Sequence, residues 1–416
     1  MDKSYTLPKY SIPGLRLENH LEDLCEFIIF VESRGHKIRG TRLERYRKYL
    51  EDIVDGGQDS KNIFHDIQNE EFNTKYDVLL YVLREVHELM WIQKGFKSKT
   101  PKNIDEKLSL LIGGKDFAAL DKKTVSRNTQ FELRIASYFS QTGYTSDLSS
   151  KTDIIATKGK HQFYVECKRV SSQGQLFKRL LEAKDQLNNR IPGSNLSLAK
   201  YGIIVVDVTK IAFKHNGVIM GYTSEHARDL IQDKLKEISN GIASHESLWN
   251  LKPLIMVWLQ VHIPSLILYP STFSTRISSL FISSHKVSSK RKFRKAFEEL
   301  KLTLEIGEQK DPREITKKLP PIRNEITIPK GTIFKWDEEI LREFLDLWEL
   351  SGRDPDRVIL EVEFPTEHAV FHYQELIWLL PNIPHSLREK LSGELSLARS
   401  VLMAMLIRQR NPYESG

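Results

Sequence analysis

Residue types that together bind divalent cations and activate water lie close together near the middle of this chain. They occur in the passage FELRIASYFSQTGYTSDLSSKTDIIATKGKHQFYVECKRV, residues 131–170, which contains Asp153, Glu166 and Lys168. A hard cation such as Mg²⁺ takes carboxylate oxygens, and because it keeps several waters it needs only one or two protein carboxylates. A lysine beside such an ion can orient or deprotonate a water and offset negative charge that develops during reaction.

The second half of this passage predicts two short strands. They are expected over residues 152–157 and 161–170, with a glycine-containing turn between them. Because alternate side chains of a strand point to opposite faces, Glu166 and Lys168 share one face of the second strand. Asp153 on the first strand could therefore join Glu166 at one ion. An ion held in this way supplies what phosphodiester hydrolysis requires, a polarised phosphate and a water of lowered pKa.

Glu132 is a fourth candidate, on a helix expected over residues 128–142 and ended by Gly143. It shares an apolar stripe of that helix with Ile135 and Phe139. A carboxylate on such a stripe is costly to bury without a partner. A metal site would be such a partner, and a nearby Arg or Lys would serve equally well.

The order Glu132, Asp153 and Glu166-x-Lys168 resembles the PD-(D/E)xK nuclease superfamily, which has the restriction-endonuclease-like fold. The local text is most similar to its Mrr-like restriction enzymes and archaeal Holliday-junction resolvases, over about residues 130–190. The resemblance implies that Asp153 and Glu166 are metal ligands and Lys168 is the catalytic lysine. It implies that Glu132 is an accessory ligand or orienting carboxylate, that Mg²⁺ is the cofactor, and that Mn²⁺ can substitute for it.

Four points weigh against a simple interpretation of the motif. Thr152 stands where the family has a proline, and Gln186 is followed by Arg190 where some branches have a tyrosine. An E-x-K triplet by itself occurs in most proteins of this size. Glu166 and Lys168 would also fit a solvated strand face with a cross-strand pair to Asp153. The order of helix, glycine turn, Asp strand and E-x-K strand is what favours the nuclease interpretation.

Basic residues near this passage and further along the chain are candidates for contact with a nucleic-acid backbone. One group follows the E-x-K strand, and a denser group lies on a helix that Phe293 and Phe297 would anchor. A solvated helix face, partly balanced by Glu298 and Glu299, fits the second group equally well. The predicted nucleic-acid-binding residues are Arg169, Lys178, Arg179, Lys290, Arg291 and Arg294.

Hydrophobic periodicity divides the chain into three parts. Residues 1–122 read as a helical N-terminal region, residues 123–305 as a nuclease-like domain of alternating helices and strands, and residues 320–416 as a small α/β module. The predicted fold class is α/β (α+β), a restriction-endonuclease-like core with a mixed sheet flanked by helices. Helices are expected over 15–32, 76–94, 175–190, 224–240, 336–350 and 387–408, and strands over 201–208, 254–262, 275–283 and 358–362.

Composition limits the class of protein without identifying it. The 416 residues are 40% hydrophobic and 28% charged, with a formal net charge of +7, so a soluble protein with a weak preference for polyanions is expected. The two cysteines, Cys25 and Cys167, form no zinc or disulfide pattern. The start has no secretory signal, and the apolar stretch 253–269 is too short to span a bilayer. A cytoplasmic protein without a membrane partner is predicted.

The sequence thus predicts a metal-dependent phosphodiesterase, a Mg²⁺-dependent endonuclease that cleaves double-stranded DNA. Restriction or anti-phage (antiviral) defence is the role suggested by analogy with the family. One alternative is a nuclease-fold subunit that binds DNA or assembles with weak or no cleavage, as a homo-oligomer or with a partner protein. The helix expected over 387–408 could supply such an interface. A second alternative is a nuclease that acts on RNA.

Overall fold

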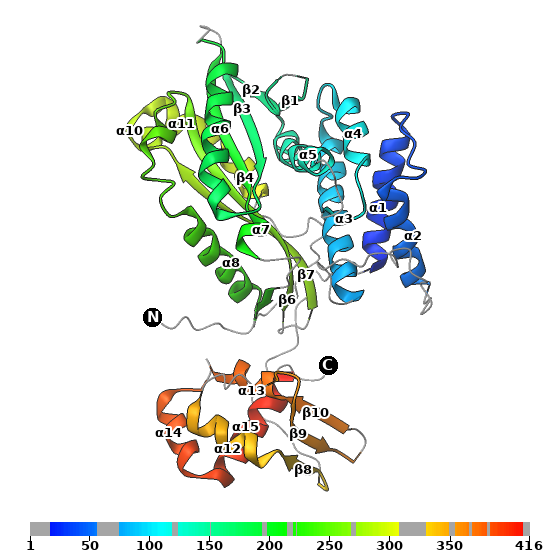
Figure 1. The fold of residues 1–416 in the computed structure, drawn as a ribbon, viewed down its shortest axis with the longest axis vertical. Helices are drawn as coiled ribbons and strands as arrows, with labels where there is room; N and C mark the ends of the chain where they lie inside the picture. Colours follow the sequence, from blue (N-terminus) through cyan, green and yellow to red (C-terminus); the bar gives the residue numbers. More distant parts are fainter. Residues whose placement is uncertain are drawn as a thin grey trace.

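The computed structural model describes twelve segments: residues 17–55, 75–118, 124–149, 151–193, 198–213, 219–221, 223–267, 272–307, 330–348, 354–365, 368–380 and 383–410. Their buried side chains form three hydrophobic cores. Two of these cores lie on the two faces of one large sheet, and the third belongs to a C-terminal module (Figure 1).

The large sheet has seven strands and mixes parallel with antiparallel pairing. Its strand order is β1-β2-β3-β4-β6-β5, with β7 paired to β6. Strands β3, β4, β6 and β5 are parallel, whereas β1–β2, β2–β3 and β6–β7 are antiparallel. The bounds are β1 (Thr145–Asp147), β2 (Ile154–Lys158), β3 (His161–Arg169), β4 (Ala199–Asp207), β5 (Ile219–Gly221), β6 (Leu254–Ile267) and β7 (Thr272–Ser283).

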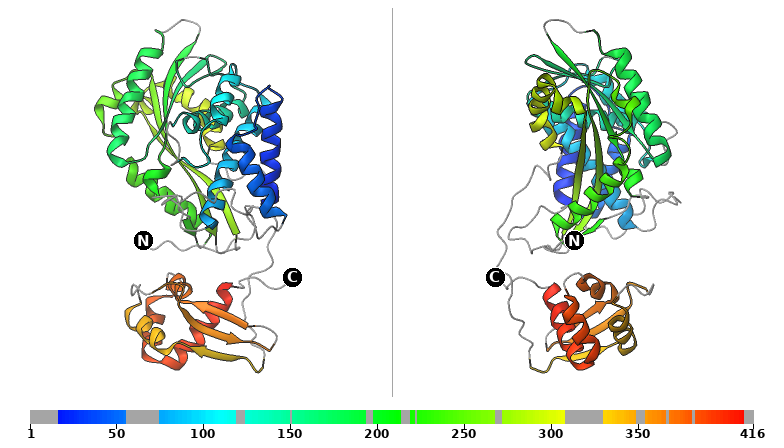
Figure 2. Two further views of the ribbon diagram at one scale, coloured as in Figure 1. Left: turned by 45° about the vertical axis from the view of Figure 1, so that its right-hand side comes forward. Right: turned by 90° about the vertical axis from the view of Figure 1, so that its left-hand side faces the viewer.

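One face of the sheet is covered by helices that precede the first strand in the sequence and by helices that follow the last strand (Figures 1 and 2). Buried residues of this face include Phe163, Val165 and Cys167 of β3, so the odd-numbered side chains of that strand point toward it. The packed helices share a core with the strands, and the N-terminal helices are therefore integral to this body. These helices are α1 (Leu17–Glu32), α2 (Arg42–Val54), α3 (Lys75–Ser98), α4 (Ile104–Ile112), α5 (Val125–Gln141), α10 (His285–Ser289) and α11 (Arg291–Ile306).

The opposite face is covered by helices that connect the parallel strands. Leu176, Leu180 and Leu187 repeat at helical spacing along α6 and are buried here against Tyr164 of β3. The even-numbered side chains of β3 therefore point toward α6, which is the alternation predicted for Glu166 and Lys168. The helices on this side are α6 (Gln173–Arg190), α7 (Thr209–Ala212), α8 (Ser224–Ser239) and α9 (Glu246–Trp249).

Most elements predicted for the large body are present, and two boundaries differ for physical reasons. Helix α3 continues through Ser98, beyond the end expected at residue 94. Strand β6 was expected to end at His262 but continues through Pro264. Pro264 lies between the last residue that pairs with β4 and the first that pairs with β5, where the strand needs no donor on that side.

The C-terminal module combines a three-stranded antiparallel sheet of order β10-β9-β8 with four helices among its described residues. Its own core includes Phe344, Leu360 and Leu402. The single long helix expected over 387–408 is wrong: two helices, α14 and α15, meet at Glu394, directly after Gly393. The elements are β8 (Ile333–Trp336), α12 (Glu338–Leu347), β9 (Val358–Glu363), β10 (His368–His372), α13 (Tyr373–Leu379), α14 (His385–Gly393) and α15 (Leu395–Arg410). The stretch expected to join the two domains, between residues 305 and 320, is described only as far as Gly307.

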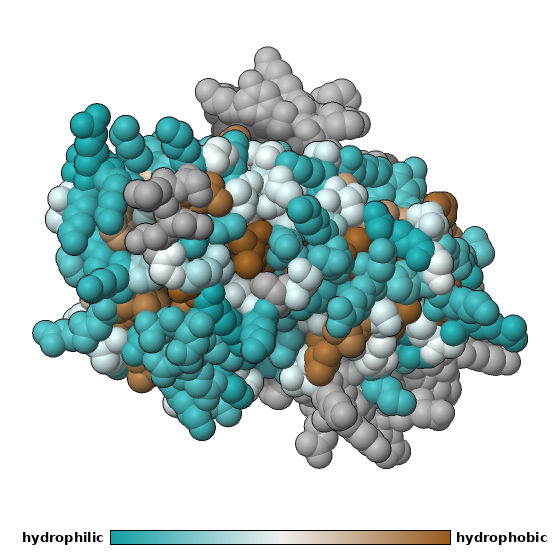
Figure 3. All heavy atoms as spheres, turned by 90° about the horizontal axis from the view of Figure 1, so that it is seen from above, coloured by the Kyte–Doolittle hydropathy of each residue, from teal (hydrophilic) through white to brown (hydrophobic). Residues whose placement is uncertain are grey.

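The surface viewed from above Figure 1 is mostly hydrophilic, with small separate hydrophobic areas among its described residues (Figure 3). Within the described parts of the chain, no helix has the length and apolar character needed to cross a membrane.

Candidate functional site

Asp153 lies directly before β2, and the pairing of β2 with β3 decides what it faces. Ile154 pairs with Val165, so continuing the antiparallel register by one residue sets Asp153 opposite Glu166. A hydrogen bond fixes this position, because the backbone N–H of Cys167 donates to Asp153 Oδ2 over 2.7 Å. The structure therefore brings together the two carboxylates that the sequence predicted as neighbours.

Glu166 is completely buried and is held between two cations. The Arg190 guanidinium donates from Nη1 to Glu166 Oε1 over 2.5 Å, and Lys168 Nζ lies 3.4 Å from Oε2. Lys168 shares the strand face of Glu166, whereas Arg190 is the last residue of α6, the helix that covers this face. The side chains of Glu166 and Lys168 thus point into the protein. They do not form the solvated strand face that the sequence also allowed.

Burial and a neighbouring carboxylate together disfavour the charged form of Glu166. Burial and the nearby charge of Asp153 raise the pKa of Glu166 to about 7, although Lys168 and Arg190 act in the opposite direction. An additional positive charge beside Asp153 and Glu166 would favour the ionised form of both carboxyl groups. Their oxygens are of the hard type that Mg²⁺ prefers. The residues present therefore fit one divalent cation between Asp153 and Glu166.

Glu132 approaches the site from α5, and a lysine that the sequence did not single out holds it. Lys107 Nζ of α4 lies 2.6 Å from Glu132 Oε2, and the two side chains are only 19% and 12% exposed. Burial and the charge of Asp153 raise the pKa of Glu132, while Lys107 and Lys168 lower it. The sequence allowed either a metal ion or a nearby Arg or Lys as the partner of Glu132, and in the structure the partner is a lysine.

The four predicted residues do not form a cage of three carboxylates. Among the described residues, no group of three or more His, Cys, Asp or Glu side chains is arranged to hold a metal ion. Asp153 lies near enough to Glu166 to influence its charge, Lys168 adjoins Glu166, and Glu132 is paired with Lys107. The role of Glu132 as a metal ligand stays a prediction, and the geometry gives it a different partner.

Arg169 was predicted to contact nucleic acid, but its guanidinium is engaged inside the molecule. It points to the face opposite Glu166, where Nε lies 3.0 Å from Asp207 Oδ2. Its Nη1 donates to the backbone oxygen of Arg127 over 3.1 Å. We therefore leave Arg169 out of the surface considered for nucleic acid.

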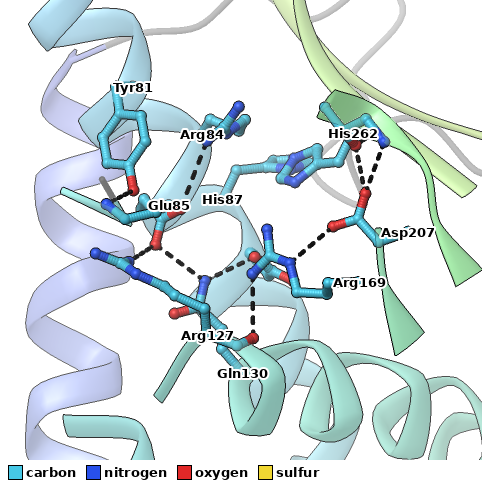
Figure 4. A network of polar contacts seen from close by, with 12 residues as sticks. Tyr81, Arg84, Glu85, His87, Arg127, Gln130, Arg169, Asp207 and His262 are labelled. Atoms are coloured by element: carbon cyan, nitrogen blue, oxygen red, sulfur yellow. Dashed lines mark hydrogen bonds and ion pairs between the residues drawn. The ribbon is translucent and has the colours of Figure 1, made fainter. Parts of the chain in front are cut away.

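Arg169 belongs to a buried ionic network that joins the N-terminal helices to the strand ends (Figure 4). Glu85 of α3 accepts from Arg42 Nη1 over 3.1 Å and also from Arg127 Nη1. Buried charges are costly unless paired in this way. The network comprises Arg42, Glu85, Glu88, Arg127, Gln130, Arg134, Arg169 and Asp207. It ties the strand that carries Glu166 and Lys168 to helices α3 and α5.

The other predicted nucleic-acid contacts lie on exposed helix surfaces. Lys178 and Arg179 lie on α6, where Arg179 pairs with Glu182 at 2.7 Å. On α11, Phe293 is buried and the neighbouring cations point outward, as the sequence predicted. A hollow of about 560 Å³ there is lined by Ser289, Arg291, Arg294, Lys295 and Glu298. Lys290, the residue directly before α11, is also exposed, and we call Lys290, Arg291, Arg294 and Lys295 together the basic surface of α11.

Comparison with known proteins adds no name for this arrangement: no protein-family model, curated protein or solved structure matches the chain. The function is therefore inferred from the residues and their geometry.

Sequence reasoning missed two cations of the site, Lys107 and Arg190. Lys107 precedes the recognisable passage and reaches Glu132 only through the packing of α4 on α5. Arg190 was noted only as a departure from a family pattern. A signal for Arg190 did exist, because a buried Glu on the preceding strand requires a cationic partner from the helix that covers it.

Proposed function

We propose that this protein is a metal-dependent nuclease that hydrolyses phosphodiester bonds of DNA at Asp153, Glu166 and Lys168. The observation that carries the proposal is the pairing of β2 with β3, which brings Asp153 opposite a buried Glu166 that has Lys168 beside it. This juxtaposition supports a site for one divalent cation with a lysine at its edge. A Mg²⁺ ion bound there would supply a Lewis acid for the phosphate and lower the pKa of a water.

The protein residues have separate tasks in this proposal. Asp153 and Glu166 would hold the ion, with Asp153 fixed by the backbone N–H of Cys167. Lys168 would orient the attacking water, hold or accept its proton at Nζ, and offset charge on the phosphate. Arg190 keeps the Glu166 carboxylate oriented through its hydrogen bond to Oε1. The basic surface of α11 would contact the nucleic-acid backbone without reading sequence.

A second candidate function has its own observation. Both oxygens of Glu166 are already engaged by Arg190 and Lys168, as they would be in a site kept only for structure. A nuclease-fold subunit that binds DNA or assembles with other proteins without cutting is therefore the alternative. Cleavage in the presence of a divalent cation distinguishes the two functions.

The test is a cleavage assay on supercoiled plasmid, linear DNA and single-stranded RNA, with Mg²⁺ or with EDTA. Wild-type protein should cut DNA only with the metal. The substitutions Asp153→Asn and Lys168→Met should each lower the rate at least about 100-fold, the scale typical of lost acid–base or charge-stabilising groups. Asp185→Asn on the outer surface of α6 and Lys97→Met on α3 are matched controls, because both are exposed members of surface ion pairs.

Each outcome decides between the functions. Cutting that survives both site substitutions would refute the assignment of the site. DNA binding without cutting under Mg²⁺ or Mn²⁺ would favour the non-cleaving subunit, and cutting of RNA alone would redirect the proposal to that substrate. We propose restriction or anti-phage defence in the cytoplasm as the setting of the activity, by analogy alone.

A further inference from the structure

Lys107 brings a positive charge from the N-terminal helices into the carboxylate cluster of the proposed nuclease site. Its Nζ lies 2.6 Å from Glu132 Oε2, and its side chain is 19% exposed. The two residues come from different helices, α4 and α5, whose buried residues include Leu108 and Leu133 of one common core. This contact is therefore built by tertiary packing.

The backbone before α4 fixes where Lys107 can reach. The Lys102 N–H donates to the backbone oxygen of Ser146 over 2.9 Å, and Leu148 N–H donates to the Lys102 oxygen over 3.2 Å. Residue 102 thus pairs in parallel with the edge strand β1. Asn103 follows with a left-handed backbone (φ 60°) and starts the helix, so Lys107 lies in its first turns. The sheet edge itself positions this lysine.

The surroundings of Lys107 favour its charged form. Burial by itself would lower the pKa of its ammonium, but Glu132 and then Asp153 raise it above the ordinary value. The positive charge of Lys107 therefore interacts electrostatically with Glu132 and Asp153, two of the three carboxylates of the cluster. A divalent ion that approached Glu132 would meet this charge at the same oxygen.

We propose that Lys107 is a positioning residue that replaces a second metal ion: its ammonium occupies the Glu132 side of the cluster, and the site therefore binds one divalent cation, at Asp153 and Glu166. This inference rests on the proposed function, because it assumes that Asp153 and Glu166 bind an ion.

Calorimetric titration of the full-length protein with Mn²⁺ at neutral pH, without nucleic acid, tests the proposal. Wild-type protein should bind one ion. Lys107→Met should bind two ions, or one at least about five times more tightly, because a carboxylate is released and a repelling charge is removed. Lys107→Arg, which keeps the charge, should return binding to one ion with wild-type affinity. Lys97→Met, which removes a lysine from an exposed pair with Glu26, is the control and should not change binding.

Further variants separate the possible failures. If Asp153→Asn binds Mn²⁺ as wild type does, the metal site and with it the proposed function are wrong. If Asp153→Asn loses binding while Lys107→Met still binds one ion with unchanged affinity, only the role of Lys107 is overturned. Adding Glu132→Gln to Lys107→Met should abolish the gain. Should Lys107→Met not fold by circular dichroism, Lys107→Gln provides the same test, because it keeps a donor for Glu132 without the charge.

Discussion

At the scale of single residues, the site is a balance between three carboxylates and three cations. Glu132 pairs with Lys107, and Glu166 is held by Arg190 and Lys168. Asp153 is fixed by a backbone N–H and has no such partner in direct contact among the ion pairs of the described residues. The carboxylate with the least compensation is thus the one opposite Glu166, which is where the proposed ion would bind.

Lys168→Arg separates charge from proton transfer in the proposed reaction. Arginine keeps a positive charge, but its pKa is too high for it to accept or release a proton near neutral pH. We expect DNA binding without metal to stay within about two-fold of wild type, and cleavage to fall about 100-fold. Fluorescence anisotropy and single-turnover cleavage measure the two effects. Cleavage at the wild-type rate would mean that Lys168 contributes charge alone.

Asp207 should make stability depend on pH on the acidic side. Burial would raise the pKa of its carboxyl, but Arg169, Arg134 and hydrogen bonds from Thr209 outweigh it and hold this pKa below the ordinary 3.8. A lowered pKa in the folded state means that the ionised carboxylate stabilises the fold fully above about pH 4. That contribution is lost as the pH falls through the lower, folded pKa.

The variant Asp207→Asn tests this expectation. At pH 7 it should be less stable than wild type by about 3 kcal/mol, because Arg169 loses its buried partner. The difference should shrink as the pH falls from about 4 toward the lower pKa of the folded state, because the unfolded chain takes up the proton first. Urea unfolding of both proteins between pH 3 and 7 measures it. A difference that does not change with pH would show that the carboxylate charge is not what stabilises this position.

At the scale of elements, the basic surface of α11 predicts how binding should depend on salt. Each phosphate contact releases counterions, so the logarithm of the binding constant falls linearly with that of salt concentration. Replacing Arg291 and Arg294 by glutamine should reduce this slope by about one for each phosphate that is no longer neutralised, whatever the DNA sequence. Lys234→Gln with Lys236→Gln on α8, both in exposed ion pairs, is the control. An unchanged slope would leave α11 as a merely solvated helix.

Hydrophobic periodicity predicted most helices and strands, because the spacing of apolar residues follows which side chains of an element are buried. It failed where the limits of an element depend on the elements packed beside it. The alternation of Val165, Glu166, Cys167 and Lys168 gave the correct faces of β3. The continuation of β6 through Pro264 depends on which strands lie beside it and cannot be read locally. The break between α14 and α15 had a local signal in Gly393, but the apolar residues on both sides of it concealed that signal.

The candidate site divides in the same way. Asp153 and the E-x-K pair lie on two strands joined by a short turn, so register alone brings them together. Lys107 and Arg190 join the site through helix packing, for which one sequence offers no pattern. Arg169 adjoins Lys168 in sequence, and strand alternation turns it to the opposite face and into the buried ionic network.

At the scale of the whole molecule, one body contains both the N-terminal helices and the large sheet. Trp91 of α3, Tyr138 of α5 and Trp258 of β6 lie in one core, and the buried ionic network also joins α3 to α5. The sequence division at residues 122 and 123 therefore does not separate two cores. The C-terminal module, in contrast, has a core of its own.

Fragments should behave accordingly. A fragment of residues 1–307 should fold cooperatively and keep the proposed activity, and residues 330–416 should fold independently. A fragment that begins at residue 123 should be insoluble or unfolded, because it exposes the core face of the sheet and leaves Arg127 and Arg134 without Glu85 and Glu88. Circular dichroism and thermal melts of the three fragments measure this. A stable, cooperative fragment from residue 123 would contradict the shared core.

The pairing of Lys102 with β1 also bears on the solubility of the molecule. An unprotected edge strand offers unpaired backbone groups on which another chain can add, which is a common origin of aggregation. Here β1 has three residues, carries Asp147, and is met on its outer side by residue 102. The residues that lead into α4 thus cover the edge of β1. Loss of this pairing would expose the edge to association with another chain, and it would also displace Lys107.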